Sequence, residues 1–406
     1  MRKIHYAGRV YNNEEISNLK QATEEFQLTS GHFIKEFEEG LSDFLNVKYS
    51  LMVSSGSSAN LLAFMTLTSH ELGEKRITRN SEVITTACCF PTTISPIINY
   101  GAIPVFVDVN IDTMNINTNE LELALTERTR AVFIAHTLGN PFNITTVLDF
   151  CKKYNLWLIS DCCDSLGSTY KGNSLESYGD ISTSSFYPAH HITCGNGGAI
   201  HTNNNQLYKI AKSFCNWGRD YKCNECISDC KKRYENNYDC RYEYNHLGFN
   251  LQPTEFQAAI GVAQLKKLNK FIEVRQNNWN KLRVELDNLY EYFYFQEFKM
   301  FGIVSPFAFL LTLKSNCNFK RNEIVQYLED NGIETRFLFA GNILRQKCFS
   351  YLQESIDYKV IGNLDNTNYI MDNSFFIGCY PGLEKEDLDY MIQEIKNFIE
   401  LKENTK

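Results

Sequence analysis

With 406 residues, the chain is longer than one ordinary hydrophobic core needs and suits one large and one small domain. Its formal net charge of −8 argues against a general nucleic-acid binder, which needs a basic face, but leaves room for small anionic ligands. The sequence has no apolar run of about 18 residues, so no membrane span is expected, and no signal peptide is recognisable. Its 14 cysteines therefore predict reduced thiols in a cytoplasmic protein, with metal or redox chemistry favoured over disulfides.

Up to about residue 200, short apolar runs alternate with helical patterns. Strands are predicted over 49–53, 82–86, 103–107, 131–136 and 156–160, and helices over 58–68 and 92–100. Apolar strands bounded by turn residues and separated by helices are typical of a mostly parallel sheet that is buried on both faces. The first part of the chain is therefore predicted to be an α/β domain.

Residues 215–246 interrupt this alternation because they are polar and rich in cysteine, and a segment of this length favours a functional loop. A helical pattern then opens at 253–255 and continues to about 290, which suggests a bridge to a second domain. Beyond it, strands (304–313, 334–339) mix with helices (321–330, 384–401). We therefore expect a large domain over 1–265, with a Cys-rich insertion at about 215–246, and a bridging helix with a small α+β domain over 266–406.

The segment 184–198 places Ser185 five residues before His190 and ends in a pair of glycines. It resembles the cofactor loop of the DegT/DnrJ/EryC1/StrS sugar aminotransferases, which use pyridoxal phosphate (PLP). In that family the serine binds the cofactor phosphate, and a lysine five residues later forms the Schiff base. Here His190 stands in the lysine position; an imidazole forms no imine, but it moves a proton near neutral pH. The resemblance therefore points to the sugar 3-dehydratases, which hold the cofactor as pyridoxamine phosphate (PMP), with His190 as the base.

The resemblance extends over nearly the whole chain and implies cofactor-binding roles for further residues. It implies a phosphate turn, an aromatic ring stacked on the cofactor, a carboxylate on the pyridine nitrogen, a second carboxylate that orients the ring, and an asparagine that reaches the phosphate of a neighbouring subunit in a homodimer. In that order the residues are Gly56, Ser57 and Ser58 for the turn, Phe90, Asp161, Asp164 and Asn250, together with Ser185. Taken one at a time these have plainer interpretations: a turn before a helix, a core phenylalanine, or a helix N-cap.

Within the family, the segments 186–193, 217–220 and 377–383 resemble the branch that acts on CDP-4-keto-6-deoxyglucose. That resemblance implies PLP fold type I, like aspartate aminotransferase. It also implies C3 dehydration of a nucleotide-linked 4-keto-6-deoxyhexose in 3,6-dideoxysugar and lipopolysaccharide O-antigen biosynthesis. An NADH-dependent flavin and iron–sulfur reductase supplies the electrons in that branch, through a [2Fe–2S] cluster on four cysteines.

Three of the four cluster positions of that branch are cysteines in this chain: Cys163, Cys223 and Cys230. The remaining position, two residues before Cys223, is Tyr221, and Cys226 is the candidate substitute. Thiolates bind zinc as well as iron–sulfur clusters, so the spacing leaves a cluster, a structural metal and no metal as alternatives.

Two further functions stay open on the sequence. One is the GDP-4-keto-6-deoxymannose 3-dehydratase reaction, in which histidine also replaces lysine but glutamate regenerates PMP and no cluster is needed. The other is a non-catalytic family member in which the cysteines hold a structural metal. No motif in the sequence reads the base of the nucleotide, so the choice of CDP depends on the resemblance alone.

Overall fold

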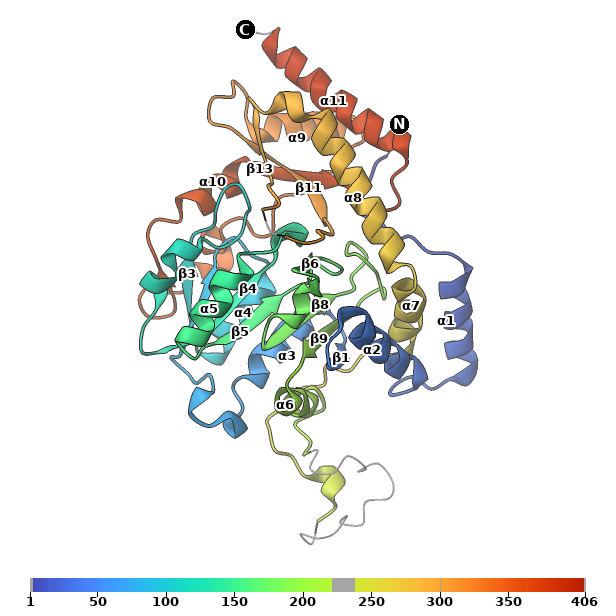
Figure 1. Cartoon of the computed structure of the whole chain (residues 1–406), viewed down its shortest axis with the longest axis vertical. Coiled ribbons are helices and arrows are strands. Elements are labelled where there is room, and N and C mark those ends of the chain that lie inside the picture. Colours follow the sequence, from blue (N-terminus) through green and yellow to red (C-terminus); the bar gives the residue numbers. More distant parts are fainter. Residues whose placement is uncertain (1–2, 221–237, 300, 405–406) are drawn as a thin grey trace.

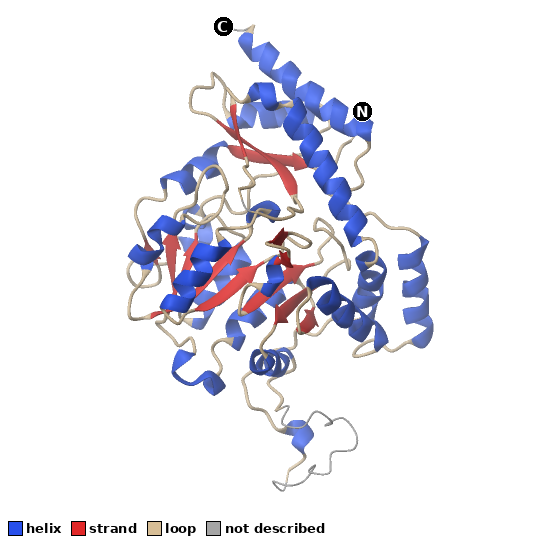
Figure 2. Ribbon diagram, viewed as in Figure 1, coloured by secondary structure: helices blue, strands red, loops and turns tan. Residues whose placement is uncertain are grey.

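The computed structural model describes residues 3–220, 238–299 and 301–404. They form a large sheet and a small sheet, each flanked by helices (Figures 1 and 2). The large sheet has the order β1-β9-β8-β5-β4-β2-β3-β12; all its neighbouring pairs are parallel except those of β9, which is antiparallel to β1 and β8. Its strands are β1 (Tyr49–Val53), β2 (Glu82–Thr86), β3 (Ile103–Val107), β4 (Thr129–Ala135), β5 (Trp157–Asp161), β8 (Ile181–Ser185), β9 (Gly198–Thr202) and β12 (Lys359–Val360).

The small sheet is antiparallel, in the order β10-β11-β13, and a separate hairpin joins β6 to β7. Those strands are β10 (Phe293–Phe295), β11 (Ala308–Leu313), β13 (Ser374–Gly378), β6 (Thr169–Tyr170) and β7 (Asn173–Ser174). The α-helices are α1 (Asn13–Glu25), α2 (His32–Leu45), α3 (Gly56–Thr66), α4 (Pro91–Tyr100), α5 (Ile144–Lys153), α6 (Asn205–Cys215), α7 (Glu255–Leu265), α8 (Leu268–Glu285), α9 (Arg321–Asp330), α10 (Asp365–Asn373) and α11 (Lys385–Glu403). Short 3₁₀ helices span η1 (His70–Lys75), η2 (Thr118–Ala124), η3 (Thr137–Gly139), η4 (Leu175–Ser177), η5 (Cys240–Tyr242), η6 (Asp287–Leu289), η7 (Ile343–Arg345) and η8 (Lys347–Phe349).

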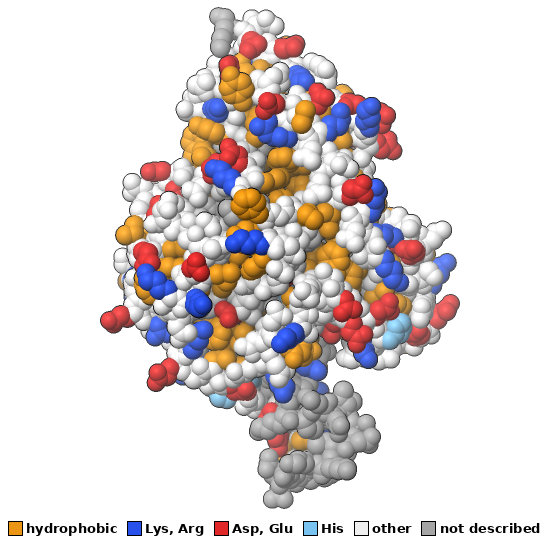
Figure 3. Space-filling view, viewed as in Figure 1, with side chains coloured by type: hydrophobic (Ala, Val, Ile, Leu, Met, Phe, Trp, Pro, Cys, Tyr) orange, Lys and Arg blue, Asp and Glu red, His pale blue; other side chains and the backbone are white. Residues whose placement is uncertain are grey.

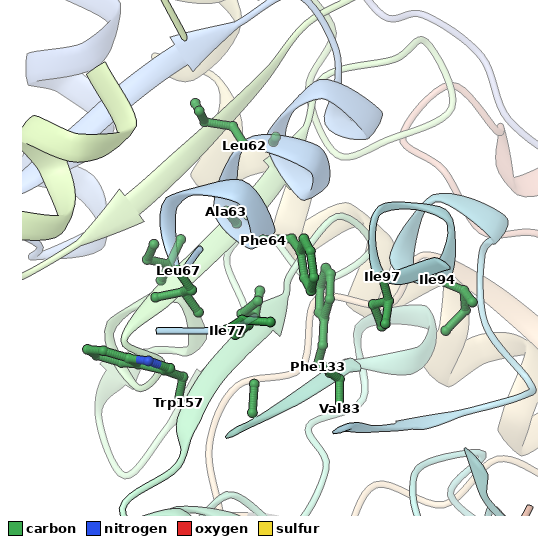
Figure 4. Close-up of a cluster of buried hydrophobic side chains, with 14 of the residues drawn as sticks. Leu62, Ala63, Phe64, Leu67, Ile77, Val83, Ile94, Ile97, Phe133 and Trp157 are labelled. Carbon is green, nitrogen blue, oxygen red and sulfur yellow. The ribbon is translucent and has the colours of Figure 1, made fainter. Parts of the chain in front are cut away.

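Helices α3 and α4 pack on one face of the large sheet through a buried apolar cluster (Figure 4). Phe64 of α3 and Ile97 of α4 are fully buried, as are Val83 of β2 and Phe133 of β4 below them. Each helix follows a strand directly, so both helices begin at the edge where the parallel strands end. The packing therefore holds two helix N-termini over one edge of the sheet.

Most of the predicted early strands form with bounds close to those expected, and α9 has the bounds expected. The helical pattern over 253–290 divides into α7 and α8 at Lys266 and Lys267. The strand predicted over 304–313 begins only at Ala308, because residues 304–307 bond to the large domain and to α8 instead. The strand predicted over 334–339 is wrong: Arg336 makes a single bridge to Phe376, and Phe339 has a positive φ of 45°.

Helix α8 runs from the large sheet to the small one, beside α11 (Figure 1). Near its C-terminal end the chain returns to the large sheet. Strand β12 lies in the part predicted as the small domain, but it pairs with β3. Charged side chains of both signs are interspersed over the face shown in Figure 3. Within the described residues, no helix is both long and apolar enough to cross a membrane.

Helix α2 begins without a cap of its own, since its N-cap residue is Gly31. A carboxylate from α7 replaces it: Glu255 accepts from the N–H groups of Gly31 at 2.8 Å, Phe33 at 2.9 Å and Ile34 at 3.3 Å. Glu255 is itself buried. The free N–H groups at the start of α2 are thereby satisfied by a residue remote in the sequence.

A second buried carboxylate has no such partners. Glu176, in η4, is 1% exposed, and neither carboxylate oxygen bonds to another of the described residues. Burial raises the pKa of Glu176 to about 8, from 4.5. The side chain is therefore mainly protonated at neutral pH.

We expect Glu255→Ala to lower the free energy of unfolding by about 2 kcal/mol, because it leaves buried N–H groups at the start of α2 without an acceptor. Urea unfolding followed by circular dichroism measures this loss. Glu39→Ala is the control, since it removes an exposed 3.8 Å pair with Lys35 and should cost less than about 0.5 kcal/mol. Equal losses in the two variants would contradict this role of Glu255.

We expect the stability of the wild type relative to Glu176→Gln to fall as the pH rises from about 4.5 to about 8. In that window the folded chain keeps a proton that the unfolded chain releases, so each pH unit costs at most about 1.4 kcal/mol. Below the window both states bind the proton, and the difference between the two proteins should be constant. Denaturant unfolding of both at several pH values tests this, and a difference that does not change with pH would refute it.

Candidate active site

The centre of the site is Asp161, the last residue of β5, which is 4% exposed. One carboxylate oxygen accepts from Asn60 of α3 at 2.8 Å and from Thr93 of α4 at 2.9 Å. The other accepts from the backbone N–H of Cys163 at 3.1 Å. A carboxylate oriented in this way at the ends of parallel strands can bind a protonated ring nitrogen.

The turn before α3 lies directly against the end of β8. A Cβ atom on Gly56 would come within 2.5 Å of the Cβ of Ser185, and one on Gly198 within 2.4 Å of the Ser55 carbonyl oxygen. Ser55 caps α3 by accepting from the N–H of Ser58 at 3.0 Å. Small residues are therefore needed here, and the first turn of α3 has the N–H groups and partial positive charge that bind anions.

Three of the residues expected to bind one phosphate thus lie together. Gly56 and Ser185 are in contact, and Ser58 follows in the first turn of α3; Ser57 between them is exposed. The hydroxyl of Ser58 lies 2.9 Å from those of Ser54 and Ser55. The cluster offers several hydroxyl groups next to a helix N-terminus.

His190 lies beside Asp164, with its Nδ1 3.6 Å from a carboxylate oxygen and both side chains largely buried. That distance is too long for a hydrogen bond. Neither Nδ1 nor the second oxygen of Asp164 has a hydrogen-bond partner within the described part of the chain. The ring of Phe307 packs against the imidazole, with centroids 5.3 Å apart.

Burial acts on the two groups in opposite directions. It raises the pKa of Asp164 to about 8, with a further rise from the Asp161 carboxylate. Burial and then the Arg275 guanidinium lower the pKa of His190 to about 3. At neutral pH the pair is therefore a neutral acid beside a neutral imidazole. The sequence suggested an unperturbed imidazole that titrates near 6.5, and the structure differs because the ring is buried.

Two of the expected residues are at the surface of the chain. Phe90 is 51% exposed and precedes α4, one turn before Thr93. Asn250 is also exposed; it bridges to Asn216, and its neighbour Leu251 accepts from the N–H of Ser54 at 2.9 Å. Both lie near the site, but neither side chain bonds to the groups at its centre.

Of the four expected metal ligands, only Cys163 is described. It is partly buried, its sulfur lies 4.0 Å from the hydroxyl of Thr183, and burial raises the pKa of its thiol. Cys223, Cys226 and Cys230 lie outside the described residues, as does Tyr221. No disulfide joins two cysteines of the described ranges, and no three His, Cys, Asp or Glu residues there are placed to hold a metal.

The sequence interpretation did not identify Asn60, Thr93 and Arg275. Asn60 and Thr93 are buried polar residues on helices that otherwise pack apolar side chains, and both orient Asp161. The sequence signal that could have identified them is a polar residue at a position of each helical pattern that is otherwise apolar. Arg275 carried no signal, because its partners are backbone carbonyls remote in the sequence.

Comparisons with known proteins place this arrangement in a family. The model of the DegT/DnrJ/EryC1/StrS aminotransferase family matches residues 10–396. The lipopolysaccharide biosynthesis protein RfbH of Salmonella typhimurium is 45% identical over 97% of this chain and 91% of its own length. The dTDP-4-dehydro-2,6-dideoxy-D-glucose 3-dehydratase of Saccharopolyspora spinosa is 38% identical over 98% of this chain and 86% of its own.

A solved structure of GDP-4-keto-6-deoxy-D-mannose-3-dehydratase from E. coli, with bound hydrated PLP, is similar over nearly the whole chain. The TM-score is 0.88 at 29% identity, covering 97% of this chain and 99% of that one. The family and the fold expected from the sequence are thereby confirmed. The chain belongs to the DegT/DnrJ/EryC1/StrS aminotransferase family and has the fold of its PLP-dependent enzymes, with a large, mostly parallel sheet and a small antiparallel one.

Proposed function

We propose that this chain catalyses the PMP-dependent removal of the C3 hydroxyl from a nucleotide-linked 4-keto-6-deoxyhexose. The observation that carries the proposal is His190 in the position of the family's Schiff-base lysine, beside Asp164 and the strand end that holds Asp161. Two relatives named as 3-dehydratases support this reaction class. The name of RfbH supports a role in lipopolysaccharide biosynthesis.

The site residues fit a pyridine cofactor with a phosphate group. The buried Asp161 carboxylate would bind the ring nitrogen, and Gly56, Ser58 and Ser185 would surround the phosphate. A side chain at Gly56 would collide with Ser185, so the close approach needs glycine there. Asp164 lies next to His190, and its other carboxylate oxygen has no hydrogen-bond partner within the described residues. Phe90 is proposed to stack on the ring. When bound, PMP supplies the amine that joins the C4 ketone and a ring that accepts electrons.

His190 is proposed to take a proton from the cofactor's methylene carbon and to return it to the departing C3 hydroxyl, which leaves as water. Among the described residues, Nδ1 of the neutral imidazole has no hydrogen-bond partner, so it is available for this proton. Its pKa of about 3 makes it a weak base in the chain alone, but a nearby anionic ligand raises the pKa because it stabilises the imidazolium. The phosphate of the cofactor and the diphosphate of the substrate are such anions.

Loss of water leaves the sugar two electrons more oxidised than its 3-deoxy product. We infer that an NADH-dependent flavin and iron–sulfur reductase supplies these electrons through a [2Fe–2S] cluster. Its proposed ligands are Cys163, Cys223, Cys226 and Cys230. The support is the sequence spacing and the position of Cys163 two residues after Asp161.

The assembly and the substrate are further parts of the proposal. A cytoplasmic homodimer, in which the exposed Asn250 reaches the partner's phosphate, follows from the family resemblance. CDP is proposed as the nucleotide on the resemblance of the loop segments, and the product would enter 3,6-dideoxysugar synthesis. Assays with CDP-, GDP- and dTDP-linked substrates distinguish the nucleotides.

The second candidate is the glutamate-dependent reaction on GDP-4-keto-6-deoxymannose. The E. coli 3-dehydratase that shares the fold at a TM-score of 0.88 favours it. That reaction needs no cluster and no reductase. Bound PMP without iron, together with activity supported by glutamate, would select it over the first proposal. A protein that binds neither cofactor nor substrate would instead be the non-catalytic family member.

We expect His190→Asn to reduce dehydration at least about 100-fold, because the proton acceptor is lost, while PMP still binds. Release of the 3-deoxy product reports the reaction, and the cofactor's absorbance reports binding. His190→Lys should likewise abolish dehydration, because the lysine amine can bond covalently to PLP and so take the place of the substrate's amine partner. A variant that kept the wild-type rate would exclude His190 as the base.

His246→Gln is the matched control for these variants. His246 is also buried, but its ring nitrogens lie 2.7 Å and 2.8 Å from the hydroxyls of Ser69 and Ser213, so they face serines rather than the site. We expect its dehydration rate to stay within about threefold of wild type when folding is preserved. A large loss there would mean that the assay responds to general destabilisation.

Protein purified without oxygen is expected to contain about two irons and two acid-labile sulfides per chain. Cys163→Ser should lower both and leave PMP binding in place. Cys317→Ser is the control, since Cys317 lies in the small domain and bonds to the Tyr292 carbonyl. Absence of iron and sulfide from the wild type would refute the cluster, and zinc in their place would identify a structural metal.

A further inference from the structure

Arg275, on α8, is a buried cation that donates to three backbone carbonyls and also contacts the thiol of Cys379. Its side chain is 1% exposed. One terminal nitrogen donates to the carbonyls of Pro306 at 3.3 Å and Phe307 at 2.9 Å, and the other donates to the carbonyl of His190 at 3.1 Å. Within the described residues it forms no ion pair. Burying a charge in this way is costly, and the three carbonyls offset part of that cost.

The other two carbonyls bonded by Arg275, those of Pro306 and Phe307, belong to a segment that runs between the two domains. Residues 303–307 precede β11 of the small sheet, yet they bond to the large domain. The N–H of Ser305 donates to the hydroxyl of Ser168 at 2.9 Å, and that of Phe307 donates to the carbonyl of Leu138 at 3.0 Å. On the other side, Gln276 of α8 donates to the carbonyl of Val304 at 2.9 Å. The segment is thus held between α8 and the large domain.

The loop that carries His190 has few other restraints on this residue. The N–H of His190 donates to the carbonyl of Tyr187 in a tight turn, and the ring contacts Phe307. Its Nδ1 makes no hydrogen bond to any described residue. The imidazole also hydrogen-bonds to the backbone of Cys163. Its own peptide and the Phe307 ring complete its placement, and Arg275 bonds to both of these residues through their carbonyls.

We propose that Arg275 is a positioning residue, which fixes the peptide of His190 against residues 306–307 and thereby places the imidazole in the site. The proposal rests on the function proposed for His190. The same guanidinium joins the bridging helix, the segment that leads into the small sheet and the loop of the reacting residue. The orientation of the small domain is therefore linked mechanically to the position of His190.

The planar fork of a guanidinium is what allows three carbonyls to be bonded at once. A lysine ammonium keeps the charge but cannot span the same three acceptors, and a glutamine amide offers two donors at one point. Arg275→Lys and Arg275→Gln are therefore both expected to release the His190 carbonyl. Arg275→Lys is the variant more certain to fold, because it keeps the charge and most of the side-chain volume.

The test compares these variants with Gln276→Ala, which loses one carbonyl bond from the adjacent position of the same helix without touching His190. We expect Arg275→Lys to lower kcat about 100-fold, with KM and PMP affinity within about threefold of wild type. Gln276→Ala should keep kcat within about threefold. A kcat near wild type in Arg275→Lys, or an equal loss in both variants at equal stability, would overturn the proposal.

Hydrogen exchange in the cofactor-free protein gives a readout that does not depend on the reaction. Peptides that cover residues 186–194 should exchange at least about fivefold faster in Arg275→Lys than in Gln276→Ala. If the wild type showed no dehydratase activity, the proposed function would fail while this comparison still tested Arg275. Unchanged exchange in this loop would overturn the positioning role whatever the reaction.

Discussion

The carboxylate of Asp161 connects the elements from which the site is built. It ends β5 and receives hydrogen bonds from α3, α4 and the backbone that follows the strand. A carboxylate at 4% exposure is stable only when such donors surround it, so the two helices must begin close to this strand end. That requirement also brings the first turn of α3 against Ser185 and leaves no space for a side chain at Gly56. The same packing of α3 and α4 therefore positions both the Asp161 carboxylate and the turn that is expected to bind the phosphate.

Around this centre, burial controls protonation more strongly than pairing does. Asp164 and His190 are close enough to suggest an ion pair, but removal from water favours the neutral form of each. A ligand that carries charge into the site changes that balance. An anionic ligand stabilises the protonated form of His190, so the proton positions with a ligand bound are expected to differ from those of the chain alone.

Much of the large sheet could be predicted because its strands are short, apolar and bounded by turn residues. The residues at strand ends, Asp161 and Ser185, followed from that pattern together with the family resemblance, and the structure places them at the same edge. Residues whose partners lie far away in the sequence could not be predicted. Glu255 caps a helix more than two hundred positions earlier, and Arg275 bonds to carbonyls that have no sequence signature. The strand expected over 334–339 had the right composition but formed only one bridge, between Arg336 and Phe376, and the chain turns at Phe339, which has a positive φ.

The return of the chain to the large sheet has a consequence for synthesis. Lys359 of β12 pairs with β3 and also reaches the buried Glu82 at 2.8 Å, where Arg128 is the other cation. While the polypeptide leaves the ribosome, the outer side of β3 stays an open edge until residue 360 has emerged, long after the other strands of that sheet are available. The last strand thus covers the outer edge of β3. A nascent chain that stalls before β12 is made would expose the unpaired edge of β3 to other nascent chains on the same mRNA.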